Sequence, residues 1–216
     1  MIISGAIFDL DGTLIDSMAI WDDLAYNFLV SQGVTPKLDL RDKVSTMYLN
    51  ESAQYVVDEY KLSCTPQDAK EYIENQIEDF YINTVPPKED ALDFLKMLKA
   101  KGVKMCVATA TERKLAIPAL ERNGMIGFFD KVFSCADIGI SKQSPEIFDK
   151  ALEFLGTPKE ETFVFEDSFH AVSTASKAGY NVIAIYDKSA EAQKDRIKKL
   201  STRFIDKYAD LNSFFE

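Results

Sequence analysis

The spacing of hydrophobic and polar residues divides the chain into two kinds of stretch. Between about residues 17 and 85, apolar side chains recur three or four positions apart, as Ile20, Leu24 and Phe28 do, which is the periodicity of an amphipathic helix. Thr65-Pro66-Gln67-Asp68 is a helix start signal, because a hydroxyl cap precedes a proline at the first helical position. The pattern predicts helices at about residues 17–32, 38–43, 50–60 and 66–85, with Ser17 as the cap of the first.

Outside this stretch, apolar runs of strand length alternate with helical patterns. The first run is Ala6 to Leu10, and from residue 88 onward a helix that ends at Gly102 opens the alternation. The later strands are predicted at Val103–Ala108, Lys131–Ser134, Thr162–Glu166, Asn181–Tyr186 and Arg203–Ile205. The helices between them are predicted at Thr111–Arg122, Ser144–Leu155, Phe169–Ala178 and Ala190–Leu200. Such alternation indicates a parallel sheet covered by helices on both faces.

The distance between the first two predicted strands indicates an insertion. The first strand ends near residue 10 and the next begins near residue 103, whereas an ordinary strand–helix–strand unit takes roughly 30 residues. The excess is the all-helical stretch. We therefore predict an α/β fold with a doubly wound, mostly parallel, Rossmann-like sheet formed by residues 1–16 and 86–216. Residues 17–85 are predicted to form an inserted all-helical cap domain. The insertion would start at the sheet edge where ligands bind, so it is placed to act as a lid.

Composition and charge narrow the classes of function. The chain has 216 residues, 46% of them hydrophobic, and carries 25 Lys and Arg against 35 Asp and Glu, a formal charge of −10. This balance argues against a basic surface for nucleic acid or anionic membranes. The three cysteines have no metal-type spacing and are expected to be reduced thiols. With no signal-peptide pattern and no apolar run of membrane-spanning length, we expect a cytoplasmic monomer.

The first strand ends in two aspartates. Asp9 and Asp11 are two positions apart, so their side chains leave a strand on the same face. Two carboxylates held together repel, which raises the pKa of one of them unless a cation or a donor intervenes. The pair is therefore a candidate for chemistry. The alternative is an Asp-rich turn in which Asp11 and Gly12 are ordinary turn residues.

Polar residues follow the later strands at the same edge of the predicted sheet. Thr109 ends the second strand, Lys142 precedes a helix opened by a proline, and Glu166 with Asp167 ends the fourth. Individually, Thr109 is typical of a helix cap and Lys142 of a solvated surface residue. Two adjacent acids near Asp9 would need a cation to offset their charge. Taken together, the order of acid pair, hydroxyl, lysine and acid pair predicts one site beyond the carboxyl ends of the strands.

These motifs resemble those of the haloacid dehalogenase (HAD) superfamily. Within it, the chain is similar to the phosphatases and beta-phosphoglucomutase-like enzymes that carry a helical cap after the first strand, and the resemblance covers the whole chain. The segments that carry it are Asp9-Leu10-Asp11-Gly12-Thr13-Leu14, Thr109, Lys142 with Pro145-Glu146-Ile147-Phe148, and Glu166-Asp167-Ser168. The first of these segments is the most specific.

The resemblance implies a role for each acid. Asp9 would be the nucleophile that takes the phosphoryl group, and Asp11 the general acid and base. The Mg²⁺ cofactor of the family would be held by Asp9, the backbone carbonyl of Asp11 and Asp167, with Glu166 assisting. These roles suit the residue types, because a carboxylate can form an acyl phosphate and Mg²⁺ prefers oxygen ligands.

The remaining motif residues are expected to bind the phosphoryl group. Lys142, the Thr109 hydroxyl and backbone N–H groups such as that of Ala110 suit the charge that develops on the phosphoryl oxygens. We therefore expect a Mg²⁺-dependent phosphatase whose partner is a small phosphomonoester, such as a sugar phosphate.

Two alternatives remain open from the sequence. A phosphomutase of the same branch would carry a histidine where this chain has Trp21 and an arginine where Lys43-Val44-Ser45-Thr46 ends, so both positions favour the phosphatase. A phospho-aspartate signalling switch uses similar groups on a similar sheet. Such receiver domains are about half this length and place the phosphorylated aspartate on a later strand. Repeated release of phosphate would distinguish the enzyme from the switch.

Overall fold

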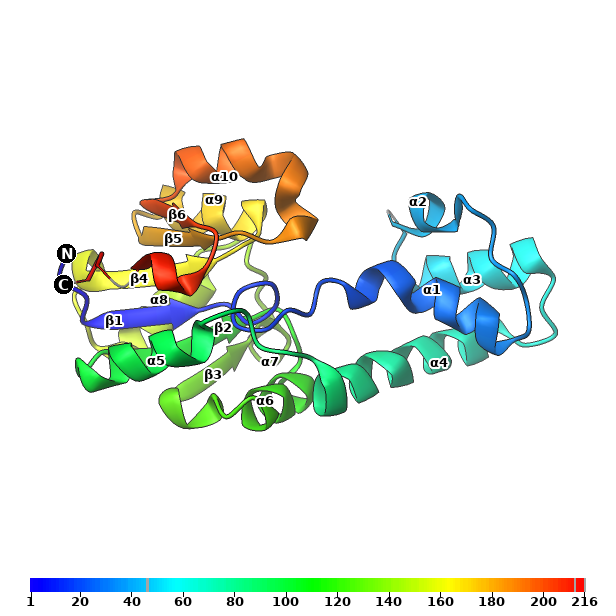
Figure 1. The fold of residues 1–216 in the computed structure, drawn as a ribbon, viewed down its shortest axis with the longest axis horizontal. Coiled ribbons are helices and arrows are strands. Elements are labelled where there is room, and N and C mark those ends of the chain that lie inside the picture. The colour runs from blue at the N-terminus through cyan, green and yellow to red at the C-terminus, as the bar shows by residue number, and fades with distance from the viewer. Residues whose placement is uncertain (46, 212, 216) are drawn as a thin grey trace. The chain divides into compact units, whose positions relative to one another are not determined.

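A computed structural model describes residues 1–45, 47–211 and 213–215. It separates the chain into two compact units. One unit contains residues 1–17 and 85–216, and the other contains residues 18–84. The first unit carries the sheet, and the second is built from helices (Figure 1).

The sheet has six parallel strands in the order β3-β2-β1-β4-β5-β6 (Figure 1). They are β1 Gly5–Phe8, β2 Lys104–Thr109, β3 Lys131–Ser134, β4 Thr162–Glu166, β5 Asn181–Ile185 and β6 Arg203–Ile205. The chain winds outward from β1 through β2 to β3, then crosses to β4 and winds the other way. The prediction of a doubly wound parallel sheet is confirmed. The point where the winding reverses lies between β1 and β4, which is where open α/β sheets bind ligands.

Helices cover both faces of the sheet. They are α5 Ala91–Ala100, α6 Arg113–Arg122, α7 Cys135–Ile138, α8 Glu146–Leu155, α9 Phe169–Lys177 and α10 Lys194–Leu200. Ile7 of β1 faces a core shared with α8, α9 and α10. Its neighbour Phe8 faces the opposite side, where its ring meets Phe94 of α5. Both side chains are fully buried, as expected for a central strand of a parallel sheet.

Several helix starts differ from the sequence prediction, including that of α8, which begins at Glu146 rather than at Ser144. Helix α1, Ile20–Ser31, begins after Ala19, and the Ser17 hydroxyl donates to the Asp11 side chain instead of capping it. Helix α6 begins at Arg113 rather than at Thr111. The helix predicted from Ala190 opens as a 3₁₀ turn, because the Asp187 carboxylate accepts the Ser189 N–H and tightens the first turn.

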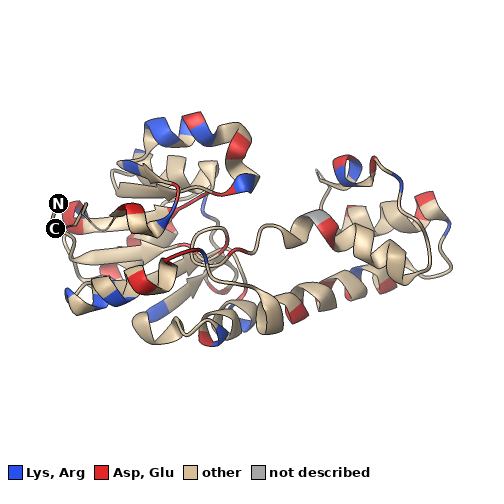
Figure 2. Cartoon of the chain, viewed as in Figure 1, with Lys and Arg blue, Asp and Glu red and all other residues tan. Residues whose placement is uncertain are grey.

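The second unit is a helical bundle. Its helices are α1, α2 Leu40–Val44, α3 Leu49–Tyr60 and α4 Pro66–Asp79, which continues into a π-helical turn at Phe80–Thr84. The predicted cap of α4 is confirmed, because the Thr65 hydroxyl accepts the Asp68 N–H and the Asp68 carboxylate accepts the Thr65 N–H. Acidic residues dominate the exposed side of α4 (Figure 2). Among the described helices, none is long and apolar enough to cross a bilayer.

Candidate active site

The turn after β1 carries the two aspartates of the first motif. The Asp9 N–H donates to the Phe165 carbonyl at 2.9 Å, which joins the end of β1 to the end of β4. Gly12 then adopts a φ of 74°, a conformation that glycine tolerates best. A Cβ atom at this position would overlap the Asp167 carboxylate. Gly12 therefore allows the turn to lie directly against the acid pair that follows β4.

Three carboxylates converge at this point. Asp9, Glu166 and Asp167 are all buried, and each offers an oxygen within 4.8 Å of the others. Burial raises the pKa of Asp9 to about 8, with Lys142 opposing the shift and Glu166 and Asp11 adding to it. Burial, followed by the charges of Glu166 and Asp9, also raises the pKa of Asp167. The group therefore stores electrostatic repulsion that a bound cation would relieve.

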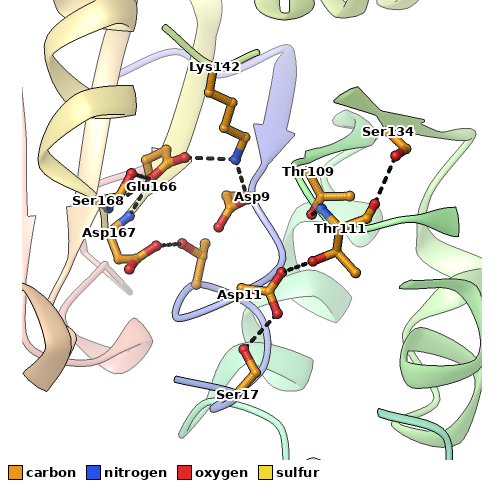
Figure 3. Close-up of polar contacts among 11 residues, drawn as sticks. Asp9, Asp11, Ser17, Thr109, Thr111, Ser134, Lys142, Glu166, Asp167 and Ser168 are labelled. Atoms are coloured by element: carbon orange, nitrogen blue, oxygen red, sulfur yellow. Dashed lines mark hydrogen bonds and ion pairs between the residues drawn. The ribbon is translucent and has the colours of Figure 1, made fainter. Parts of the chain in front are cut away.

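Lys142 supplies a positive charge inside this cluster. Its ammonium group contacts Asp9 and donates to Glu166 at 2.7 Å (Figure 3). Burial disfavours the charged ammonium, but the two carboxylates outweigh burial and raise the pKa of Lys142. The second oxygen of Glu166 accepts the backbone N–H groups of Asp167 and Ser168 at 2.9 and 2.8 Å. Glu166 is thereby fixed in place and holds Lys142 beside Asp9.

Asp11 has a different environment from the buried acids. One of its oxygens accepts the Ser17 hydroxyl at 2.7 Å, and the other accepts the Thr111 hydroxyl at 2.5 Å (Figure 3). The side chain is only partly buried. Two hydroxyl donors from separate parts of the chain therefore hold this carboxylate in one orientation. A carboxyl group held in this way, with access to water, can give and take a proton.

Thr109 and Ala110 lie at the end of β2. The register that pairs Phe8 with Val107 sets Thr109 beside the turn after β1. Thr109 is fully buried, and its hydroxyl oxygen accepts the Thr111 N–H at 3.0 Å. Ala110 lies exposed directly after the strand. The Thr109 side chain thus shapes the turn that presents Thr111 to Asp11.

Four residues of this network were not among the predicted site residues. Ser17 and Thr111 hold Asp11, Thr13 donates to Asp167 at 3.0 Å, and Ser168 donates to Glu166 at 3.1 Å. Thr13 and Ser168 stand inside motif segments that carry the family resemblance, and Thr111 lies two residues after Thr109, so the sequence contained a signal for these three. Ser17 had no such signal, because a serine before an apolar helix is typical of a cap.

The donor set of the cluster suits a hard divalent cation. Asp9, Glu166 and Asp167 present only oxygen atoms, which are the ligands that Mg²⁺, Mn²⁺ and Ca²⁺ prefer. No histidine or cysteine takes part in this group. The raised pKa values of Asp9 and Asp167 give the same indication, since a cation would favour their charged forms.

Comparisons with known proteins agree with this geometry. The family model of the haloacid dehalogenase-like hydrolases matches residues 6–185. A phosphorylated carbohydrates phosphatase from Thermotoga maritima is 24% identical over 80% of each chain. A phosphoglycolate phosphatase from Aquifex aeolicus is 28% identical, again over 80% of each chain. A crystal structure of a provisionally assigned beta-phosphoglucomutase from Thermotoga maritima has a TM-score of 0.87 at 21% identity, covers 98% of both chains and supports the fold. The matched span includes both acid pairs and Lys142, and the chain belongs to the haloacid dehalogenase-like hydrolases.

Proposed function

We propose that this protein is a Mg²⁺-dependent phosphatase that hydrolyses a small phosphorylated metabolite, such as a sugar phosphate, through an aspartyl-phosphate intermediate. The observation that carries the proposal is the buried group of Asp9, Glu166 and Asp167 with Lys142 beside it. Relatives named as phosphatases of phosphorylated carbohydrates and of phosphoglycolate support the substrate class.

In the first step, an Asp9 carboxylate oxygen attacks the phosphorus atom of the bound ester. The bond between phosphorus and the ester oxygen breaks, and Asp11 gives a proton to the leaving alkoxide. Lys142 contacts Asp9 and stabilises the negative charge on the phosphoryl oxygens. The hydroxyls of Ser17 and Thr111 keep the Asp11 carboxyl group in one orientation during the transfer.

In the second step, Asp11 removes a proton from a water molecule. The resulting hydroxide attacks the phosphorus atom of the acyl phosphate, the bond between phosphorus and the Asp9 oxygen breaks, and inorganic phosphate leaves. Thr109 would add its hydroxyl and Ala110 its backbone N–H to the groups that bind the phosphoryl oxygens. Asp9 and Asp11 thereby return to their starting states, as turnover requires.

Asp9, Asp167 and the backbone carbonyl of Asp11 would hold Mg²⁺, with Glu166 assisting. When bound, Mg²⁺ neutralises the crowded carboxylates and withdraws charge from the phosphoryl group. We further propose that residues 17–85 act as a cap that selects the leaving group, with the remainder of the chain forming the catalytic core.

The nucleophile can be tested by Asp9→Asn. We expect this variant to release no phosphate above background from small phosphomonoesters in the presence of Mg²⁺, because an amide does not form an acyl phosphate. A colorimetric phosphate assay with purified protein measures the outcome. Asp93→Asn, a change of the same kind at an exposed position on α5, is the matched control and should keep wild-type activity. Turnover that survives Asp9→Asn would remove Asp9 from the nucleophile role.

A phosphomutase remains the second candidate, and a substrate panel separates the two. Trp21 stands where the mutases carry a histidine, and the comparison at Thr46 falls outside the described residues. Phosphate release over many turnovers from a panel of phosphorylated metabolites supports the phosphatase and argues against a phospho-aspartate switch. Conversion of beta-glucose 1-phosphate into its 6-phosphate isomer without release of phosphate would favour the mutase instead.

A further inference from the structure

Residues 208–211 and 213–215, the C-terminal segment, pack near the strand ends that carry the acid cluster. Tyr208 opens a 3₁₀ turn at Tyr208–Leu211, is 1% exposed, and has its ring centroid 5.1 Å from that of Phe94. Phe94 in turn contacts Phe8 and Phe165, the residues that directly precede Asp9 and Glu166. The C-terminal segment therefore belongs to the aromatic layer that supports both catalytic strand ends.

A chain of buried hydrogen bonds leads from this segment to the metal-binding acids. The Tyr208 hydroxyl donates to the backbone carbonyl of Thr13 at 3.1 Å. The Thr13 side-chain hydroxyl donates to Oδ1 of Asp167 at 3.0 Å. Tyr208, Thr13 and Asp167 are each less than 5% exposed. Two hydrogen bonds, both made by Thr13, therefore connect Tyr208 to the Asp167 carboxylate.

The phenol is held in the form that can donate. Burial, together with the negative charges of Asp9 and Asp167, raises the pKa of Tyr208 well above its ordinary value. The hydroxyl therefore remains protonated throughout the range in which the protein would work. Its proton is directed at a carbonyl, which can only accept.

We propose that Tyr208 is a positioning residue for the metal site: it fixes the carbonyl of Thr13, so that the Thr13 hydroxyl holds Oδ1 of Asp167 and leaves Oδ2 for the cation. This inference rests on the proposed metal-dependent function. Oδ2 of Asp167 lies against Gly12, in the turn whose backbone Tyr208 holds. A small shift of that turn would therefore move the hydrogen-bond donor of Asp167 and change the space beside its carboxylate. Removing a residue that orients a metal ligand commonly lowers the affinity of the site for the metal.

Other contacts anchor the C-terminal segment without the Tyr208 hydroxyl. Leu211 is fully buried, and the Phe215 ring packs against Phe163. The Lys101 ammonium donates to the Phe215 carbonyl at 2.7 Å, and the N-terminal amine donates to that of Phe214 at 3.2 Å. Removing the hydroxyl alone should therefore leave the segment in place. Tyr208→Phe then tests the hydrogen bond rather than the fold.

The test compares Tyr208→Phe with Tyr180→Phe. Tyr180 is also buried and donates to Asp149 at 2.6 Å, but it packs in the core on the opposite face of the sheet. We expect Tyr208→Phe to raise the Mg²⁺ dissociation constant, measured by isothermal titration calorimetry, by roughly 3- to 10-fold. Tyr180→Phe should leave it unchanged. In activity assays, the loss in Tyr208→Phe should be recovered by higher Mg²⁺ concentrations, since the chemistry itself is intact.

A double-mutant cycle identifies the route. If Tyr208 acts through Thr13, then Tyr208→Phe should have no further effect on Mg²⁺ affinity in a Thr13→Val background. Equal affinities for Tyr208→Phe and the wild type would overturn the inference, as would full additivity with Thr13→Val. Wild-type protein that binds no Mg²⁺ would overturn the inference together with the proposed metal dependence. Because calorimetry does not require turnover, failure of the phosphatase proposal is recognised separately.

Discussion

At the residue scale, burial and pairing give each acid its own character. Asp9 lies among other carboxylates in a buried site, and its pKa is raised to about 8. Asp187, at the end of β5, is equally buried but accepts the Lys88 ammonium at 2.5 Å and the Ser189 hydroxyl at 2.6 Å. Burial would raise the pKa of Asp187, yet these hydrogen bonds lower it. The same residue type therefore has a raised pKa at one strand end and a lowered pKa at another.

Asp187→Asn should destabilise the protein in a pH-dependent way. The folded pKa of Asp187 lies below its ordinary value of 3.8, so its contribution is present at neutral pH and is lost as the pH falls through the folded pKa. We expect a loss of about 1 to 3 kcal/mol at pH 7, because the amide removes the closer carboxylate partner of the largely buried Lys88 ammonium and leaves only the more exposed Asp16, at 3.5 Å. Urea unfolding of variant and wild type should give curves that converge as the pH falls from about 5 towards 3.

The exposed ion pair of Asp93 and Lys96 is the control for the pair of Asp187 and Lys88. Asp93 contacts Lys96 at 2.7 Å, but both side chains are more than half exposed. Asp93→Asn should change stability little at any pH, because exposed pairs contribute little. If Asp187→Asn lowers the stability equally at every pH, then the shape of the Asp187 side chain, and not its charge, accounts for its contribution to stability.

At the element scale, strands and helix ends were predictable to different degrees. The strands at Lys131–Ser134, Thr162–Glu166 and Arg203–Ile205 match the prediction residue for residue, because short apolar runs between turn residues have few other interpretations. Helix starts were less predictable. Thr65 caps α4 as predicted, whereas the Ser17 hydroxyl is used by Asp11. A local cap signal gives way where a distant side chain competes for the same hydroxyl.

Thr65→Ala should weaken the helical unit. The substitution removes the acceptor for the Asp68 N–H at the start of α4, and loss of such a cap typically costs about 1 kcal/mol. Urea unfolding followed by circular dichroism would detect it. Thr174→Ala is the matched control, because that hydroxyl donates within α9 to the His170 carbonyl and caps no helix end. A Thr65→Ala variant as stable as the wild type would contradict the role of the cap.

At the scale of the whole molecule, the fold concentrates negative charge that a cation would offset. The chain carries a formal charge of −10, and three of its carboxylates are buried together at the point where the sheet reverses its winding. Their repulsion is present in the folded state and largely absent from the unfolded chain. A cation that binds only the folded state stabilises it by mass action.

Mg²⁺ should therefore raise the melting temperature of the wild-type protein. At about 100 times the dissociation constant, binding to one site adds about 2.7 kcal/mol, which corresponds to roughly 5 to 10 °C for a chain of this size. Thermal unfolding with MgCl₂, compared with NaCl at equal ionic strength, measures the shift. Asp167→Asn should abolish it, and a shift that persists in this variant would locate the cation elsewhere.

Local patterns alone determined the strands, the helical insertion and the polar residues at the strand ends, including Asp9, Asp11, Lys142 and Asp167. These features depend on neighbours within a few positions, which the sequence displays directly. The tertiary structure decided which of these groups meet. Lys142 and Asp9 are 133 positions apart, Lys88 and Asp187 are 99 apart, and Tyr208 and Thr13 are 195 apart. Such pairings depend on the order of the strands and the path of the C-terminal segment, and no local periodicity records either of them.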